Sequence, residues 1–246
     1  MRRLLASPDP QDRSVLLLDA RQLRHAVRVL RMRPGDRFVA FDGLGHQWEA
    51  ELVETRVPGR ARVLRELPPA AVPYRLTVYQ AIPKGDRMDL VVRMGTELGV
   101  SEFVPVRTRR TVATGDRQYR WRRVAAEAAK QCGRSTVPEV APVVEFGQAV
   151  DRFRQHEVRL ALWEGGGRPL ASVLYESRGD DLGIFVGPEG GFDPQEVASL
   201  ERVGVLCTLG PLVLRTETAA VAAAAVVLAL RGFTSPRAAA TLGQRP

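Results

Sequence analysis

Residues 183–218 read GIFVGPEGGFDPQEVASLERVGVLCTLGPLVLRTET. Two short apolar runs, 183–186 and 205–209, each lead into a glycine-bearing loop and then into a stretch with helical spacing, at 194–202 and 216–230. A strand, a loop and a helix repeated in this order are typical of an α/β fold with a parallel sheet. Ligands of such sheets bind at the carboxyl ends of the strands, where both loops are expected.

The same alternation extends back to residue 76. It predicts strands at 76–82, 103–106, 140–144 and 158–163, each followed by a helix, at 86–98, 117–132, 146–153 and 169–175. Together with the two C-terminal units, these segments predict a mostly parallel sheet that is covered by helices on both faces.

The first part of the chain has a different pattern. Short apolar runs at 15–18, 37–41, 48–53 and 61–64 are separated by turns rich in Gly, Asp and Pro, and one helical stretch covers 20–31. This pattern predicts a small β-barrel with one helix. The proline-rich segment 68–73 reads as a stiff linker. We therefore expect two domains, residues 1–70 and residues 74–246.

The charge distribution indicates a polyanionic partner. The formal net charge is +8, and the first 136 residues contain 26 of the 36 basic residues but only 15 of the 28 acidic ones. A basic excess confined to one part of a protein favours nucleic acid as a partner. A basic surface that serves only solubility is the alternative.

Several protein classes are excluded. The longest apolar stretch, 219–230, has 12 residues, whereas a membrane-spanning helix needs about 20. The N-terminus has no apolar core of a signal peptide, and Cys132 and Cys207 form no CxxC motif. We expect a cytoplasmic protein without membrane contact or disulfides. P-loop, dinucleotide and GxSxG motifs are absent, and no cluster of ligands predicts a metal site.

Three glycine-bearing loops, each after a predicted strand, are the candidate site. They are 163–167, 187–192 and 209–218, and the last brings Arg215 and Glu217 to the start of an apolar helix. Glycines let the backbone approach a ligand, and a helix N-terminus presents free N–H groups. The alternative is a set of ordinary strand–helix turns with polar helix caps.

The segments 187–192 and 209–219 closely resemble the SPOUT superfamily of S-adenosylmethionine-dependent RNA methyltransferases. More narrowly, the chain resembles the RsmE family, which methylates N3 of a uridine in 16S ribosomal RNA. The resemblance extends to 25–31, 35–36, 84–88, 96–100 and 127–135, in family order. It therefore covers nearly the whole chain.

The resemblance implies a PUA-like, RNA-binding β-barrel at 1–70 and a SPOUT α/β methyltransferase domain at 74–246 with a deep trefoil knot. It also implies 16S rRNA within the 30S subunit as the partner, and a homodimer formed through the C-terminal helix at 219–230. Burial of this helix within one subunit is the alternative. Two other functions stay open: a SPOUT methyltransferase that acts on tRNA ribose, and a non-catalytic rRNA-binding assembly factor.

The resemblance further implies that the three loops bind S-adenosylmethionine. The expected cofactor-binding residues are Leu162, Trp163, Glu164, Gly187, Glu189, Gly190, Gly191, Leu209, Gly210, Leu214, Arg215 and Thr218. Arg215 and Glu217 are the candidate catalytic residues. We expect Arg215 to stabilise negative charge on uracil O2 or O4, unless it forms an ion pair at the dimer contact. Glu217 either orients Arg215 or accepts a proton through water.

Basic residues in or beside the matching segments are the expected RNA contacts. They are Arg24, His25, Arg28, Arg31, Lys84, Arg87, Arg107, Arg109, Arg110, Arg122 and Arg134. Spacings of three and four residues predict that Arg24, Arg28 and Arg31 share one helix face. The alternative for each arginine is a solvated charged surface.

Overall fold

The computed structural model describes residues 2–112 and 117–232, and the chain divides into two compact units. The first unit contains Met1–Ala71 and Ala126–Val137, and the second contains Val72–Ala125 and Pro138–Pro246. We expected one division near residues 70–74. The structure adds residues 126–137 to the first unit, where backbone hydrogen bonds join residue 45 to residue 135 and residue 137 to residue 43.

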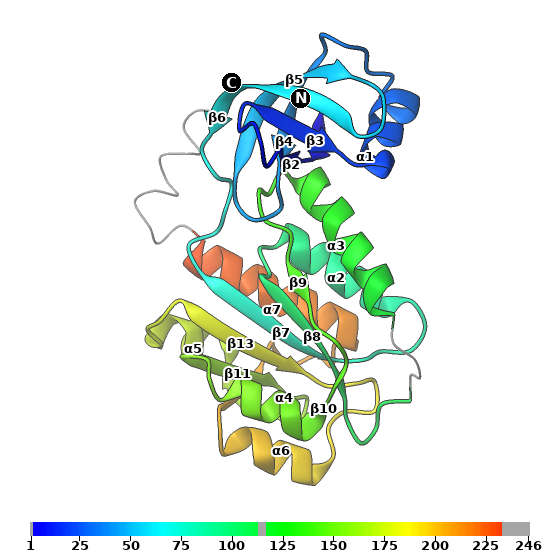
Figure 1. The fold of residues 1–246 in the computed structure, drawn as a ribbon. Coiled ribbons are helices and arrows are strands. Elements are labelled where there is room, and N and C mark those ends of the chain that lie inside the picture. Colours follow the sequence, from blue (N-terminus) through cyan, green and yellow to red (C-terminus); the bar gives the residue numbers. More distant parts are fainter. Residues whose placement is uncertain (1, 113–116, 233–246) are drawn as a thin grey trace. The chain divides into compact units, whose positions relative to one another are not determined.

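A curled sheet of six strands forms the first unit (Figure 1), in the order β1-β4-β5-β6-β3-β2. Its strands are β1 (Arg3–Leu5), β2 (Ser7–Pro8), β3 (Val15–Leu18), β4 (Arg37–Phe41), β5 (Gln47–Glu54) and β6 (Gly59–Leu67), and its helical segment consists of α1 (Ala20–Arg24) and the π-helical turn η1 (His25–Val29). Leu4, Leu16, Phe38 and Leu52 are fully or almost fully buried in its core. The sheet therefore encloses a hydrophobic core of its own.

The helical segment of this unit differs from the prediction. One α-helix over 20–31 was expected, but η1 follows α1, and the Leu30 N–H bonds to the His25 carbonyl at 3.0 Å. Arg31 lies beyond the helical turns, with a φ of 53°. A π-helical turn contains more residues than an α-helical turn, so residues three and four apart do not line up as they do in an α-helix. The expectation that Arg24, Arg28 and Arg31 share one α-helical face is therefore wrong.

The second unit contains a parallel sheet with the strand order β10-β8-β7-β13-β11-β14-β12, in which β9 also pairs with β8. The strands are β7 (Arg75–Ala81), β8 (Glu102–Arg107), β9 (Glu139–Val140), β10 (Val144–Glu145), β11 (Val158–Leu162), β12 (Arg168–Pro169), β13 (Asp181–Val186) and β14 (Val205–Thr208). Nearly every residue of the central strand β7 is buried, as expected for a strand covered on both faces. The predicted parallel α/β sheet is confirmed.

Among the described residues, six helices belong wholly or partly to the second unit: α2 (Arg87–Glu97), α3 (Gln118–Cys132), α4 (Phe146–Phe153), α5 (Leu170–Glu176), α6 (Pro194–Glu201) and α7 (Thr216–Arg231). Side chains alternate between the faces of a strand. Tyr79 packs with Phe153 of α4 and with Leu200 of α6, whereas the next residue, Gln80, contacts Thr216 of α7. Helices α4 and α6 therefore cover one face, and α2 and α7 pack together on the other (Figure 1).

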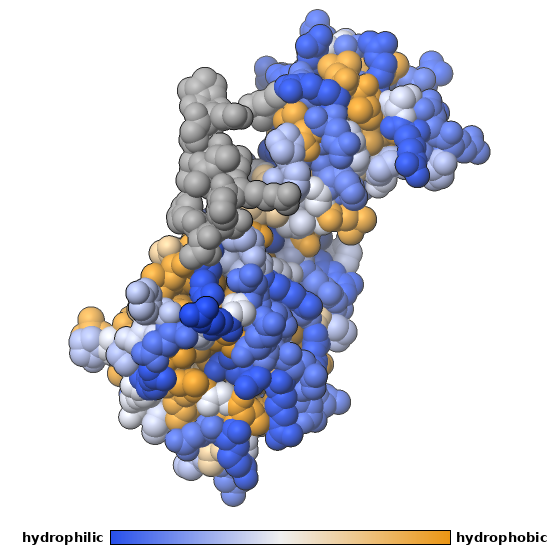
Figure 2. Space-filling model, turned by 90° about the vertical axis from the view of Figure 1, so that its left-hand side faces the viewer, coloured by the Kyte–Doolittle hydropathy of each residue, from blue (hydrophilic) through white to orange (hydrophobic). Residues whose placement is uncertain are grey.

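Helix α7 is partly buried in the second unit. Ala220, Ala223, Ala224 and Val227 form its buried side, and the helix packs against α2, α5 and β13. Hydrophobic patches interrupt the hydrophilic surface in the view from the side of α5 (Figure 2). Although the sequence of α7 is apolar, neither this helix nor any other in the described part of the chain is long and apolar enough to cross a membrane.

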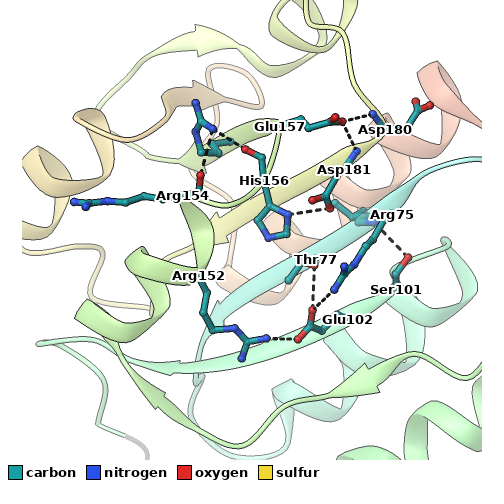
Figure 3. Close-up of polar contacts among 12 residues, drawn as sticks. Arg75, Thr77, Ser101, Glu102, Arg152, Arg154, His156, Glu157, Asp180 and Asp181 are labelled. Atoms are coloured by element: carbon teal, nitrogen blue, oxygen red, sulfur yellow. Dashed lines mark hydrogen bonds and ion pairs between the residues drawn. The ribbon is translucent and has the colours of Figure 1, made fainter.

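Buried polar groups surround the amino ends of β7, β8 and β13, which we call the amino edge of the sheet (Figure 3). Glu102 is buried and accepts hydrogen bonds from Arg75 and Arg152, with the Thr77 hydroxyl at 3.4 Å. His156 is also buried there and bonds to Tyr79 and Asp181. We call the opposite side of the sheet, where these strands end, the carboxyl edge.

Candidate active site

A cavity of about 480 Å³ lies at the carboxyl ends of β11, β13 and β14. This volume lies within the range of small-molecule sites. The three glycine-bearing loops provide most of its lining, which consists of Arg87, Leu162, Trp163, Glu164, Val186, Gly187, Pro188, Glu189, Gly191, Cys207, Thr208, Leu209, Gly210, Pro211, Leu212, Val213, Leu214, Arg215, Thr216, Glu217 and Ala219. The prediction that these loops wall one pocket agrees with this geometry.

The loops contact one another closely. The Trp163 N–H bonds to the Cys207 carbonyl at 3.0 Å, which joins the first loop to β14. Gly191 has a φ of +68°, and a Cβ added to it would lie 2.1 Å from Glu164 Oε1. A side chain at this position would therefore displace the Glu164 carboxylate from the second loop.

Two carboxylates of the pocket share one arginine. Arg87, the first residue of α2, places Nη1 2.5 Å from Glu189 Oε1 and Nε 3.5 Å from Glu217 Oε1. Glu189 Oε1 also accepts the Lys84 N–H at 2.9 Å. Partial burial alone would raise the pKa of Glu189, but the hydrogen bonds from Lys84, from its own N–H and from Arg87 together lower it. Glu189 is therefore charged at neutral pH.

The two candidate catalytic residues have contrasting surroundings. Arg215 precedes α7, is exposed, and its guanidinium forms no hydrogen bond or ion pair with any described residue. Glu217 is in the first turn of α7, and its partner in the described structure is Arg87. Its other oxygen, Oε2, is buried and has no partner among the described residues. The Arg215 guanidinium is thus open to a ligand, and Glu217 keeps one buried oxygen without a partner among the described residues.

Cys207 is the one sulfur in the pocket lining. It is fully buried, and burial raises the pKa of its thiol to about 11. A thiol with this pKa is protonated at neutral pH and is a poor nucleophile. Within residues 2–112 and 117–232, no group of three or more His, Cys, Asp or Glu residues is arranged to hold a metal ion.

The pocket lining contains ten of the twelve predicted cofactor-binding residues. The two exceptions are Gly190 and Thr218. Gly190 lies in the second loop, where its carbonyl accepts a hydrogen bond from Arg110 at 2.9 Å. Thr218 is exposed in the first turn of α7. Both residues therefore adjoin the pocket in sequence without contributing to its wall.

The predicted RNA-binding residues fall into two sets. Arg24, His25, Arg28, Arg31 and Arg134 belong to the first unit, and Lys84, Arg87, Arg107, Arg109, Arg110 and Arg122 belong to the second. Burial, followed by the nearby charge of Lys130, lowers the pKa of His25, so His25 is neutral at pH 7.

Besides Arg87, the other four arginines of the second set also have protein partners. Arg107 lies 3.4 Å from a Glu145 oxygen, Arg109 lies 3.5 Å from an Asp193 oxygen, and Arg122 donates to the carbonyl of residue 140. Arg110 donates to the carbonyl of Gly190. The loop after β8 is therefore attached to the second glycine loop, beside the pocket.

Sequence reasoning missed two pocket features. Arg87 was expected to contact RNA, but it lines the cavity between two acidic residues more than 100 positions away in the chain. Gln80, which donates a hydrogen bond to Thr216 of the pocket lining, was not considered. A polar residue at the end of the apolar run 76–82 was the available signal for Gln80.

Comparisons with known proteins agree with this site. Residues 70–228 match the RNA methyltransferase domain family, and residues 18–56 match the RNA methyltransferase PUA domain. Ribosomal RNA small subunit methyltransferase E of Mycobacterium bovis is 35% identical over 232 residues, which cover 89% of this chain and 87% of that protein. The chain belongs to the ribosomal RNA small subunit methyltransferase E family.

Two further relatives of this family support the assignment. The Bacillus subtilis protein of the same name is 33% identical over 80% of this chain and 83% of its own length. The crystal structure of ribosomal RNA small subunit methyltransferase E from Neisseria gonorrhoeae, bound to S-adenosyl methionine, is 31% identical. It superposes with a TM-score of 0.85 and covers 96% of this chain and 100% of that one.

Proposed function

We propose that this protein methylates N3 of a uridine in 16S ribosomal RNA, with S-adenosylmethionine bound in the pocket at the carboxyl edge. As a member of its family, the chain is an S-adenosylmethionine-dependent rRNA methyltransferase. The observation that carries the specific proposal is the convergence of three glycine-bearing loops on one cavity that also presents Arg215 and Glu217.

The residues of the pocket fit this cofactor. Leu162, Leu209 and Leu214 provide an apolar wall of the kind that accepts an adenine ring. The carboxylates of Glu164 and Glu189 suit the ribose hydroxyls or the ammonium group of the methionine portion. Hydrogen bonds from Lys84 and Arg87 already occupy Oε1 of Glu189. Of these two carboxylates, Glu164 is therefore the freer acceptor.

The chain's own residues can assist the reaction at two atoms of the uracil. S-adenosylmethionine supplies an electrophilic methyl group on a sulfonium cation. N3 of uracil is a weakly acidic imide, so its proton must be removed as the methyl group is transferred. The buried Oε2 of Glu217 can accept this proton, directly or through water. The Arg215 guanidinium can donate to O2 or O4 as negative charge develops there.

We further propose that RNA contacts the arginines of both units and that the substrate is the rRNA within the 30S subunit. A member of this enzyme family meets its substrate in the cytoplasm, which is where we expect it to act. We also propose that the C-terminal part of the chain forms the trefoil knot. The position of β14 between β11 and β12, which both precede it in the sequence, supports this proposal.

A homodimer through α7 is part of the same proposal. The side of α7 that is not fully buried carries small residues at Thr218, Ala222, Ala225 and Ala229. Small residues let two helices approach closely. A dimer mass by light scattering at micromolar concentration is the expected result, and a monomer mass would contradict it.

Nucleoside mass spectrometry tests the function. Purified protein and labelled S-adenosylmethionine are incubated separately with 30S particles, free 16S rRNA and tRNA, all lacking the modification. We expect 3-methyluridine in 16S rRNA and no label in tRNA. Ribose-methylated nucleosides in tRNA would instead indicate a tRNA enzyme. Failure to bind the cofactor at all would indicate a non-catalytic RNA-binding factor.

A further inference from the structure

We propose that Gln80 and Thr216 form a directed hydrogen-bond relay that positions the loop at residues 187–191 for the cofactor. Both would then be positioning residues of the methyl-transfer site. This inference rests on the proposed function in one respect only, namely that S-adenosylmethionine binds in the pocket at the carboxyl edge.

The relay joins three elements. Gln80, near the end of β7, donates from Nε2 to the Thr216 hydroxyl at 2.8 Å and to the Ala81 carbonyl at 2.9 Å. The Thr216 hydroxyl, at the start of α7, lies 2.5 Å from the Gly187 carbonyl oxygen. Gln80 is fully buried and Thr216 is 6% exposed. Water therefore cannot readily replace either partner.

The direction of the relay follows from the number of protons. The amide group of Gln80 has two hydrogens, and both are used, for Ala81 and for Thr216. The Thr216 hydroxyl accepts one of them, so its single proton is free to be donated to the Gly187 carbonyl. The orientation of the Gln80 amide thus determines which way the threonine hydroxyl points.

The unpartnered oxygen of Gln80 argues for a functional role. Its Oε1 is buried and has no hydrogen-bond partner in the described part of the chain. Leaving a buried acceptor unpaired is destabilising, and an apolar residue would avoid this cost. Such unsatisfied groups are few in native proteins and each needs an explanation, of which a functional role is one. Here the amide uses its donors for the relay and leaves its oxygen unpaired.

The relay acts on the walls of the pocket. Gly187 begins the second glycine-bearing loop, and Thr216 is followed directly by Glu217, so the Thr216–Gly187 bond fixes the distance between these two walls. A ligand that touches both walls requires this distance to be set before it binds, since ordering the loop on binding would weaken affinity. We therefore expect the relay to contribute to cofactor affinity more than to the rate of the bound complex.

Substitutions at Thr216 test the relay in the full-length protein. Calorimetry without RNA should show S-adenosylmethionine bound about tenfold more weakly by Thr216→Val, which removes the hydroxyl but keeps the shape. Thr216→Ser, which restores the hydroxyl, should bind within threefold of wild type. The KM for the cofactor should rise in Thr216→Val, while kcat at saturating cofactor changes by less than threefold.

Thr77→Val is the matched control. Thr77 is a buried threonine like Thr216 and lies in β7 like Gln80, but its hydroxyl lies toward Glu102 at the amino edge (Figure 3). This variant should bind the cofactor with wild-type affinity. If Thr77→Val weakens binding as much as Thr216→Val does, the effect is a general response of the strand and the relay is refuted.

Gln80→Met keeps the test valid even if Thr216→Val folds poorly, and where both variants fold they complete a double-mutant cycle. Gln80→Met removes the donors, so it should weaken binding about as much as Thr216→Val, and combining the two should weaken it little further. Additive effects, or wild-type binding by Gln80→Met, would overturn the relay. These binding measurements use no RNA. If they refute the relay, the detection of 3-methyluridine in 16S rRNA is unaffected. A failed RNA assay likewise leaves the binding result standing.

Discussion

The two edges of the parallel sheet differ in whether their buried polar groups have protein partners. At the amino edge, buried Glu102 is paired with two arginines, and buried His156 bonds to Asp181 at 3.0 Å (Figure 3). His156 also bonds to the Tyr79 hydroxyl at 2.8 Å. At the carboxyl edge the strands lead into an open cavity, where Glu217 keeps a buried oxygen without a partner among the described residues.

The difference indicates which edge stabilises the protein and which binds a ligand. Polar groups that are buried and fully paired hold a structure rigid, whereas buried groups without partners are costly unless a ligand completes them. A clustering of titratable residues is therefore not enough to identify a site. The amino edge has the larger cluster, but the carboxyl edge has the cavity, the glycine-bearing loops and the unpaired groups.

The largest expected effect is at Arg215. Arg215→Ala should lower kcat on the order of 100- to 1000-fold, because a charged donor at the developing negative charge is lost. Arg154, an exposed arginine near the amino edge, provides the control, and Arg154→Ala should keep kcat within twofold of wild type. A kcat within twofold for Arg215→Ala would remove its catalytic role.

The next effect is at the third glycine-bearing loop. Gly210 has a φ of +143°, which residues with side chains rarely adopt, although a Cβ there would meet no atom within 4 Å. Gly210→Val should therefore shift the loop at 209–215 and weaken cofactor binding about 100-fold. Gly147→Val is the control, since Gly147 lies in α4, also has open space around it and has an ordinary φ. Equal affinities for the two variants would contradict this reading.

A smaller effect is expected at the amino edge, and on a different quantity. Burial raises the pKa of Tyr79, so its hydroxyl remains a neutral donor or acceptor for His156. Tyr79→Phe keeps the ring but leaves the imidazole without this partner. The free energy of unfolding, measured with urea, should fall by about 1–2 kcal/mol. Cofactor affinity should stay within twofold, and a tenfold loss would show that the two edges are not independent.

The smallest effect concerns pH and Glu189. Because the folded state lowers the pKa of Glu189 below its ordinary 4.5, its hydrogen bonds stabilise the protein above that pH and are lost as the pH falls through the folded-state value. The stability difference between wild type and Glu189→Gln should be constant from pH 6 to 8 and should shrink toward pH 4. A difference that grows on acidification would contradict this assignment.

Much of the second unit was predictable because short apolar runs that alternate with helical stretches across glycine-bearing loops leave few other arrangements. The positions of the strand ends, and therefore of the loops that line the pocket, followed from this pattern. Other features depend on contacts distant in sequence: Arg87 meets its carboxylates only through folding. The π-helical turn at His25–Val29 was missed because its sequence has α-helical spacing. Short strands such as β12 contain too few residues to show any period.

Hydrogen–deuterium exchange of the full chain, with and without S-adenosylmethionine and in EDTA without RNA, tests the central claim most directly. We expect the cofactor to protect peptides that cover residues 162–165, 187–191 and 209–218, at the carboxyl edge. Peptides that cover residues 152–158 and 180–182, at the amino edge, should exchange equally in both samples. Protection confined to the amino edge, or none in the three loops at saturating cofactor, would contradict the account.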